Sequence, residues 1–249
     1  KKLKSKKYNV KIITVVHLGG RLCDLEGIAK VAKKYGCKIV EDACHAPGSK
    51  YINKKGQLSK TGSCRYSIAS SFSFHAIKHV TMAEGGCITT NNKALSEKIR
   101  LKLNHDIIRK KKIRNVSKKF LDPWFYEINE LGYNYRASEI NCALGLSQLK
   151  RLSKSIKIRN RIALKYKKEL ENIDFIKFPD YSFNKKYNAW HLFTILINFK
   201  KLGISKRKFV NKLEENGIGT QVHYIPLFLQ PLYKESNLKP YKGALEYYE

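Results

Sequence analysis

Acidic residues are scarce in this sequence. Its 249 residues include 20 Asp and Glu against 50 Lys and Arg, which gives a formal net charge of +30. Such an excess ordinarily indicates nucleic acid or an anionic membrane as a partner. The basic residues are spread along the chain, with dense runs only at residues 1–7 and 109–119, and no zinc-finger spacing or RNP-like aromatic motif accompanies them. We therefore favour a compositional origin, and a nucleic-acid-binding module stays the weaker alternative.

Long hydrophobic runs and paired cysteines are also missing. No apolar stretch approaches the roughly 18 to 20 residues of a membrane span. The apolar segment after the basic start is interrupted by Lys11 and His17 and lacks a small-residue cleavage site, so we predict a strand there and no signal peptide. The six cysteines never form a C-x-x-C pair. We expect free, mostly buried thiols in a reducing cytoplasmic compartment, with neither a disulfide frame nor a metal site.

The composition that is present is typical of a folded protein, with 43% hydrophobic and 11% aromatic residues. Residues 10–16 form a β-branched run, and a Gly-Gly turn closes it at residues 17–20. Residues 24–35 carry apolar side chains at helical spacing behind Asp24, a candidate N-cap, and residues 38–40 begin another strand. This β-α-β order predicts an α/β fold with a mostly parallel sheet.

Later segments extend the pattern. We expect strands at residues 66–74 and 88–90, helices at residues 91–104, 138–149 and 153–172, and a mobile surface loop at residues 105–119. A strand–helix–strand order is expected at residues 190–199, 205–215 and 219–227. We predict a large domain over residues 1–150 and a smaller α+β domain over residues 151–249.

One lysine stands apart from the many others. Lys78 lies in the apolar and hydroxyl-rich run Ser-Ser-Phe-Ser-Phe-His-Ala-Ile-Lys, ahead of the turn Glu-Gly-Gly. A lysine amine removed from water is the group that forms Schiff bases with carbonyl compounds. The second strand delivers Asp42 and His45 at its carboxyl end, where open α/β sheets place ligands. Taken singly, these residues are more simply a surface lysine, a loop acid and a loop histidine.

Several motifs in the same order resemble the DegT/DnrJ/EryC1/StrS sugar aminotransferase family. They are His-Leu-x-Gly at residues 17–20, Glu-Asp-Ala-x-His-Ala-x-Gly at 41–48, Ser-Phe-His-Ala-Ile-Lys at 73–78, Gly-x-Asn-x-Arg at 132–136 and Val-His-Tyr-x-Pro-Leu at 222–227. The resemblance implies a fold-type I pyridoxal-phosphate transferase, with part of the large cofactor-binding domain and part of the small domain present.

The resemblance implies a role for each matching residue. Lys78 would hold pyridoxal phosphate and move protons, and Asp42 would pair with the pyridine nitrogen, because a nearby anion keeps that nitrogen protonated. His45 would lie beside the ring near its 3-hydroxyl, and Ser73 would donate to the phosphate. Asn134 would reach the phosphate of the neighbouring subunit's cofactor, which implies a homodimer with shared active sites.

The resemblance also bears on the substrate. His223 and Tyr224 would line the nucleotide-sugar pocket, and the most similar branch aminates UDP-linked 4-keto-6-deoxy-N-acetylhexosamines in pseudaminic acid-type glycan synthesis, with glutamate as the family's usual amino donor. A sister branch that dehydrates at C3 carries histidine in place of Lys78, so the lysine indicates amino transfer. Family members also carry a phosphate-cradling turn in a segment before Lys1. We therefore expect an internal piece of such an enzyme, and a catalytically inactive relative is the other alternative.

Overall fold

The computed structural model describes residues 9–109, 122–178, 187–236 and 241–249. The chain divides into two compact units. The first contains Lys1–Leu170 and Phe178–Thr194, and the second contains Glu171–Lys177 and Ile195–Glu249. The two units are described separately below, and the domains expected at residues 1–150 and 151–249 stay a prediction.

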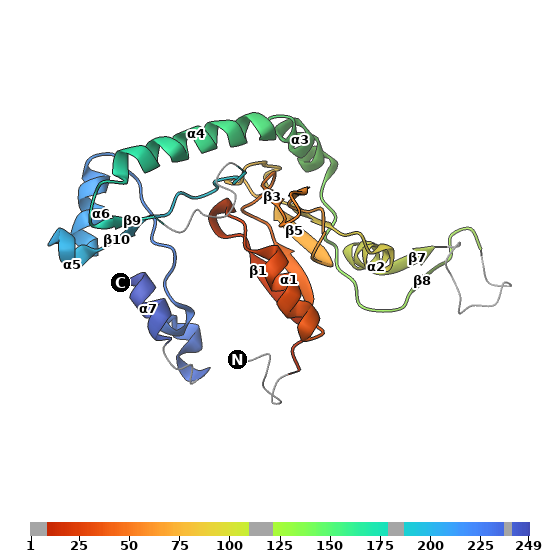
Figure 1. Cartoon of the computed structure of the whole chain (residues 1–249). Helices are drawn as coiled ribbons and strands as arrows, with labels where there is room; N and C mark the ends of the chain where they lie inside the picture. Colours follow the sequence, from red (N-terminus) through yellow and green to blue (C-terminus); the bar gives the residue numbers. More distant parts are fainter. Residues whose placement is uncertain (1–8, 110–121, 179–186, 237–240) are drawn as a thin grey trace. The chain divides into compact units, whose positions relative to one another are not determined.

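A four-stranded sheet forms the centre of the first unit (Figure 1). Its strands are β1 (Ile12–Val16), β2 (Lys38–Asp42), β5 (Ala69–Ser73) and β6 (Gly86–Thr89), in the order β1-β2-β5-β6. The first three run parallel, and β6 pairs antiparallel with β5. The predicted α/β class is confirmed, with β6 as the antiparallel member of a mostly parallel sheet.

Helix α1 (Leu25–Lys34) packs along this sheet. The predicted cap is confirmed, because the Asp24 carboxylate accepts a hydrogen bond from the Gly27 N–H at 2.9 Å. Leu25 is 2% exposed in a core that also contains Val15 and Ile39. Burying a leucine side chain contributes about 1.5–3 kcal/mol, so the apolar face of α1 holds the helix on the sheet.

The parallel register brings three strand ends together. Val16 pairs with Asp42, and Asp42 pairs with Ser71 on β5. Beyond the end of β1, the His17 N–H donates to the Asp42 carbonyl at 3.0 Å. The short helical turn η2 (Leu18–Gly20) follows directly and contains Gly19 at a φ of 69°. The loops after β1, β2 and β5 therefore start from one edge of the sheet.

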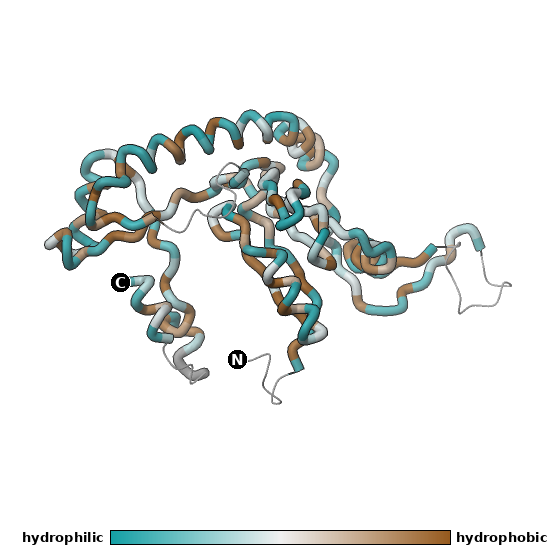
Figure 2. The backbone as a smooth tube through the Cα atoms, viewed as in Figure 1, coloured by the Kyte–Doolittle hydropathy of each residue, from teal (hydrophilic) through white to brown (hydrophobic). Residues whose placement is uncertain are grey.

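The remaining elements of the first unit are two hairpins and three helices. The elements are β3 (Lys50–Ile52), β4 (Leu58–Lys60), β7 (Ile107–Arg109), β8 (Tyr126–Ile128), α2 (Lys93–Leu103), α3 (Glu139–Leu149) and α4 (Leu152–Leu170). Helix α3 begins as expected, since Ser138 Oγ accepts from the Asn141 N–H at 3.2 Å. Hydrophobic and hydrophilic residues alternate along α4 (Figure 2). The prediction of a mobile loop at residues 105–119 is wrong for residues 107–109, which form β7 and pair with β8. Residues 110–119 of that prediction lie outside the described residues.

The second unit is smaller and mostly helical. Its elements are β9 (Ile176–Lys177), β10 (Leu196–Ile197), α5 (Phe199–Leu202), α6 (Lys206–Glu215), η5 (Leu227–Leu229), η6 (Pro231–Ser236) and α7 (Lys242–Tyr248). The strand expected at residues 190–199 shrinks to β10, and residues 219–226 form no strand. An extended segment needs a neighbouring strand for its backbone groups, and β10 pairs with β9 alone.

All six cysteines are free thiols, of which Cys37 and Cys64 are buried while Cys87 and Cys142 are exposed. The expectation of mostly buried thiols therefore holds only for part of the set. None of the helices in the described ranges combines the length and the apolar character needed to cross a membrane.

Candidate active site

Asp42 ends strand β2 and leads into the loop that carries Cys44 and His45. Its Oδ1 accepts a hydrogen bond from the Cys44 N–H at 3.1 Å. The pKa of the Cys44 thiol is raised to about 11, first by burial and then by the hydrogen bond and charge of Asp42, while the positive charge of Lys78 opposes these effects. Asp42 ends β2, and Lys78 lies in the turn that follows β5, the parallel neighbour of β2, so both residues lie at one edge of the sheet.

Lys78 lies in a closed turn between β5 and β6. The turn is held by backbone bonds from Phe74 N–H to Gly85 O and from Met82 N–H to Phe74 O, both at 2.8 Å, and the Lys78 N–H donates to His75 O at 2.9 Å. The Lys78 side chain is half-buried, and its amine has no hydrogen-bond or ion-pair partner within the described residues. The amine is therefore available to a ligand.

His45 lies in a cluster of three imidazole rings. Its centroid is 4.3 Å from that of His191, which in turn is 5.3 Å from that of His79. The His45 Nδ1 accepts from the Gly19 N–H at 3.2 Å. No group of three or more His, Cys, Asp and Glu side chains in the described part of the chain is arranged to hold a metal ion.

The two inner histidines are uncharged at neutral pH. The pKa of His191 is lowered to about 3, mainly by burial, and the nearby positive charge of Lys78 acts in the same direction. Burial likewise lowers the pKa of His79 to about 4, although its bond to the Ala189 carbonyl opposes the change. The His191 ring contacts His45, and three predicted site residues, Lys78, Asp42 and His45, lie at the end of β2 or in the loops that follow β2 and β5 at one edge of the sheet.

Ser73 and Asn134 lie in the same unit with different surroundings. Ser73 ends strand β5, and its Oγ accepts from the His75 N–H at 3.4 Å, which leaves the hydroxyl proton for another acceptor. Asn134 is exposed, and its backbone forms an isolated bridge with Asn104. No contact brings Asn134 to Lys78 within the described residues, so its role in a partner subunit stays a prediction.

His223 and Tyr224 belong to the second unit. Their ring centroids are 4.4 Å apart in an edge-to-face arrangement, and Tyr224 is 56% exposed. The Nδ1 atom of His223 is buried and has no hydrogen-bond partner among the described residues. Their proposed contact with a nucleotide sugar stays a prediction.

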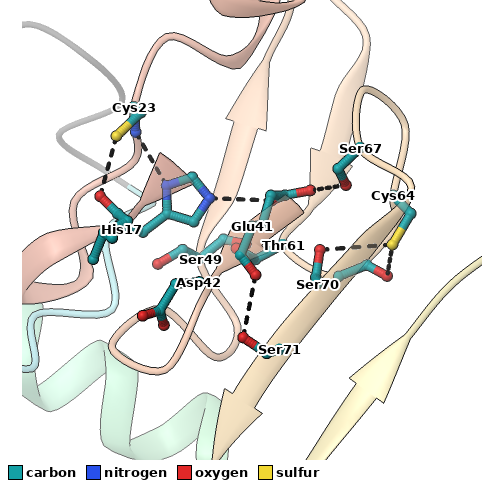
Figure 3. Close-up of polar contacts among 12 residues, drawn as sticks. His17, Cys23, Glu41, Asp42, Ser49, Thr61, Cys64, Ser67, Ser70 and Ser71 are labelled. Atoms are coloured by element: carbon teal, nitrogen blue, oxygen red, sulfur yellow. Dashed lines mark hydrogen bonds and ion pairs between the residues drawn. The ribbon is translucent and has the colours of Figure 1, made fainter. Parts of the chain in front are cut away.

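Sequence reasoning missed a buried polar pair beside the site. His17 and Glu41 are 0% and 1% exposed, and His17 Nε2 lies 3.1 Å from Glu41 Oε2 while the Ser67 hydroxyl donates to the other carboxylate oxygen. Figure 3 shows the Asp42 side chain pointing away from this pair, as expected for successive residues of a strand. The alternation of side chains along a strand was the available signal, because it places Glu41 on the face opposite its neighbour Asp42.

The protonation of this pair follows from its surroundings. Burial by itself lowers the pKa of His17, but hydrogen bonds to Cys23 and Glu41 and the carboxylate charge outweigh burial and raise it to about 9. Burial favours the neutral form of Glu41, yet hydrogen bonds from His17 and Ser67 hold its pKa below the usual value. The pair therefore fixes the end of β2 from the face opposite Asp42.

Comparison with known proteins places this geometry in context. A sequence model of the DegT/DnrJ/EryC1/StrS aminotransferase family matches residues 3–248. The chain is 39% identical over 227 residues to an uncharacterised protein of Methanocaldococcus jannaschii, covering 91% of this chain and 56% of that protein. It is 37% identical over 227 residues to the UDP-4-amino-4,6-dideoxy-N-acetyl-beta-L-altrosamine transaminase of Campylobacter jejuni, covering 90% and 54%.

Comparison with solved structures also yields aminotransferases. The chain matches a Helicobacter pylori aminotransferase involved in the biosynthesis of pseudoaminic acid with a TM-score of 0.81 and 34% identity, covering 96% of this chain and 59% of that one. Solved neighbours are fold-type I aminotransferases, which confirms the predicted fold. The chain spans only about half the length of the curated relatives it matches, 56% and 54%.

Aminotransferases of the matched family depend on pyridoxal phosphate, and the residues present fit that group. The Lys78 amine has no partner among the described residues, and Ser73 keeps a hydroxyl proton to donate. Asp42 offers an anion at the same edge of the sheet as the lysine. In the described residues, His79 Nδ1 and His191 Nδ1 are buried without a hydrogen-bond partner, and their rings belong to the histidine cluster that contains His45. Water or ligand normally satisfies such atoms.

Proposed function

Because the chain belongs to the DegT/DnrJ/EryC1/StrS aminotransferase family, we propose that it forms part of a pyridoxal-phosphate-dependent transaminase acting on a nucleotide-linked 4-keto-6-deoxy sugar. The observation that carries the proposal is the placement of Asp42 at the end of β2 and of Lys78 in the turn after β5, the neighbouring parallel strand. An amine and a carboxylate at one edge of a parallel sheet suit a cofactor that needs both.

Each residue has a distinct task in this proposal. When bound, pyridoxal phosphate supplies an electron-withdrawing ring that makes a neighbouring carbon acidic. Lys78 Nζ binds the cofactor and, once released, takes a proton from one carbon and returns it to another. Asp42 keeps a proton on the pyridine nitrogen, Ser73 donates its hydroxyl to the phosphate, and His45 lies beside the ring.

The substrate class comes from the relatives. The Campylobacter jejuni protein is named for a UDP-linked amino sugar, and the Helicobacter pylori structure is named for pseudoaminic acid biosynthesis. We extend this class to the present chain, with a UDP-N-acetyl 4-keto-hexosamine as acceptor and glutamate as amino donor. His223 and Tyr224, which are adjacent and partly exposed, are the residues we assign to the sugar nucleotide.

We also propose a homodimer with shared sites. Helix α3 buries none of its residues, and its Ile140 is 82% exposed. The segment before the helix also exposes large apolar side chains, since Leu131 is 92% exposed and Tyr135 68%. Monomeric proteins rarely expose contiguous apolar patches of this kind. Asn134 lies within this segment, so a second copy that covers the patch would carry Asn134 toward its neighbour's site.

The first test is covalent attachment of the cofactor. The natural polypeptide that contains this sequence is incubated with pyridoxal phosphate, reduced with borohydride and digested, and mass spectrometry locates the added mass. We expect the adduct on the peptide that contains Lys78 and its loss in Lys78→Ala. Lys93→Ala removes an exposed lysine of helix α2 and serves as the matched control, which retains the adduct.

The second test is amino transfer from glutamate to a UDP-linked 4-keto sugar. Asp42→Asn removes the anion that would keep the pyridine nitrogen protonated and the ring electron-withdrawing, so it should lower turnover strongly without preventing attachment. An adduct on other lysines in equal amount would contradict the cofactor assignment. A Lys78 adduct without amino transfer to any nucleotide sugar would instead favour the inactive relative.

A further inference from the structure

We propose that His191 is a positioning residue that holds the imidazole of His45 in one orientation, by packing ring against ring and through the backbone of Gly19. The inference rests on the proposed function, in which His45 lies beside the cofactor ring. Neither His191 nor the segment around it was among the residues that the motifs indicated.

The contacts around His45 form a closed cycle. The His45 ring packs on the His191 ring, with centroids 4.3 Å apart and planes at 36°. The His45 Nδ1 accepts from the Gly19 N–H at 3.2 Å, and the Gly19 carbonyl accepts from the His191 N–H at 2.9 Å. The ring of His45 is therefore held on one face by His191 and at one nitrogen by a residue that His191 itself binds.

This cycle selects one tautomer of His45. A neutral imidazole carries a single proton, and the Nδ1 that accepts from Gly19 cannot carry it. The proton therefore lies on Nε2. His191 suits this role because it is uncharged near neutral pH, owing mainly to its burial.

The segment that carries His191 is itself anchored. Ser49 is fully buried, and its Oγ accepts from the Ala189 N–H at 2.9 Å and donates to Gly20 O at 3.1 Å. His79 Nε2 donates to the Ala189 carbonyl at 2.9 Å. A Cβ atom on Gly20 would lie 2.7 Å from Trp190 N. Residues 189–191 therefore have little freedom to move, and this anchored backbone holds the His191 ring in place.

The direct test reads the His45 side chain without any cofactor. Nitrogen-15 NMR of the imidazoles should show His45 as a single Nε2–H tautomer in the wild type and in His191→Phe, which keeps an aromatic ring. In His191→Ala and His191→Leu we expect that single-tautomer pattern to be lost. Leucine fills most of the volume, so it keeps the test valid if the alanine variant does not fold.

A second readout is the dissociation constant of pyridoxal phosphate. An aromatic pair contributes about 0.5–1.5 kcal/mol, so His191→Leu should weaken binding by about 2- to 12-fold, and His191→Phe by less. The inference is overturned if the wild type binds the cofactor at Lys78 and His191→Leu matches it in both affinity and tautomer. Absence of any Lys78 adduct in the wild type overturns the proposed function instead, and the NMR comparison still decides the role of His191.

Discussion

Glu41 offers the sharpest test of how the sheet edge is stabilised. Replacing Glu41 by Gln keeps the shape of the side chain but removes the charge that faces His17 Nε2 at 3.1 Å. Removing one partner of a buried pair costs about 3–5 kcal/mol. We therefore expect Glu41→Gln to lower the free energy of unfolding by that amount near pH 6, where the wild-type pair is fully charged.

The pH dependence of the free energy of unfolding gives a second quantity to test. The pKa of His17 rises from 6.5 in the unfolded chain to about 9 in the folded protein. The resulting stability is fully present below pH 6.5 and is lost as the pH rises through 9. The change corresponds to about 3 kcal/mol. In Glu41→Gln the hydrogen bond and charge of the carboxylate no longer oppose burial, and only Cys23 still raises the pKa of His17, so this loss of stability between pH 6 and pH 9.5 should be clearly smaller.

Urea denaturation at pH 6 and pH 9.5 measures both effects. Lysines, tyrosines and thiols also titrate in this range, so the quantity to compare is the difference between variants. Glu169→Gln, at an exposed position of helix α4, should show the same loss as the wild type. Only Glu41→Gln should lose less stability than the wild type's contribution of about 3 kcal/mol.

A neutral His17 would refute this reasoning. The Cys23 N–H lies 3.3 Å from His17 Nδ1, and a strong hydrogen bond there would require an unprotonated nitrogen. We give the carboxylate the larger weight because 3.3 Å is long for an N–H hydrogen bond. If wild type and Glu41→Gln lose equal stability between pH 6 and pH 9.5, the contact of the Cys23 N–H with Nδ1 determines the protonation state of His17, and His17 is neutral.

Three further outcomes follow from single residues. Asp24→Ala removes the cap of α1 and should cost about 1 kcal/mol in urea unfolding. Gly20→Ala forces a Cβ to 2.7 Å from Trp190 N at a φ of 88°, so its cost should exceed the ~1–2 kcal/mol of left-handed strain alone, measured the same way. Cys44, with its pKa raised to about 11 from 9.0, should react with iodoacetamide about 100-fold more slowly than an ordinary thiol at pH 8. Exposed Cys142 provides the internal comparison by mass spectrometry.

Local signals predicted the parts of the fold that depend on neighbours in sequence. The caps at Asp24 and Ser138 were predicted because each bonds an amide three residues ahead. The β-α-β order was predicted because apolar spacing distinguishes strands from the helix between them. The strand expected at residues 219–227 failed because spacing shows that a segment is able to extend and cannot show whether another strand lies beside it.

The site residues also divide into those that local sequence indicates and those that depend on distant contacts. Lys78, Asp42 and His45 were predicted because each belongs to a short motif with a chemical meaning, and the structure brings them to one sheet edge while their roles stay predictions. His191 was not found, since its importance comes from contacts with Gly19 and His45, far away in the sequence. No spacing rule reports such a contact. Asn134, His223 and Tyr224 remain predictions, because their proposed partners are a second subunit and a bound sugar nucleotide.

Glu41 shows why a charged neighbour of a functional residue is easily misread. Its position beside Asp42 invites the interpretation that both carboxylates face the ligand, yet successive strand residues point to opposite faces. At 1% exposure Glu41 lies where an unpaired charge is very costly. Its cation is His17, the first residue after strand β1, whose Nε2 lies 3.1 Å from Glu41 Oε2. Strand β2 therefore presents the Asp42 carboxylate to the site and uses the Glu41 carboxylate to fix its own end. The position of Asp42 depends on the pairing of Glu41 with His17.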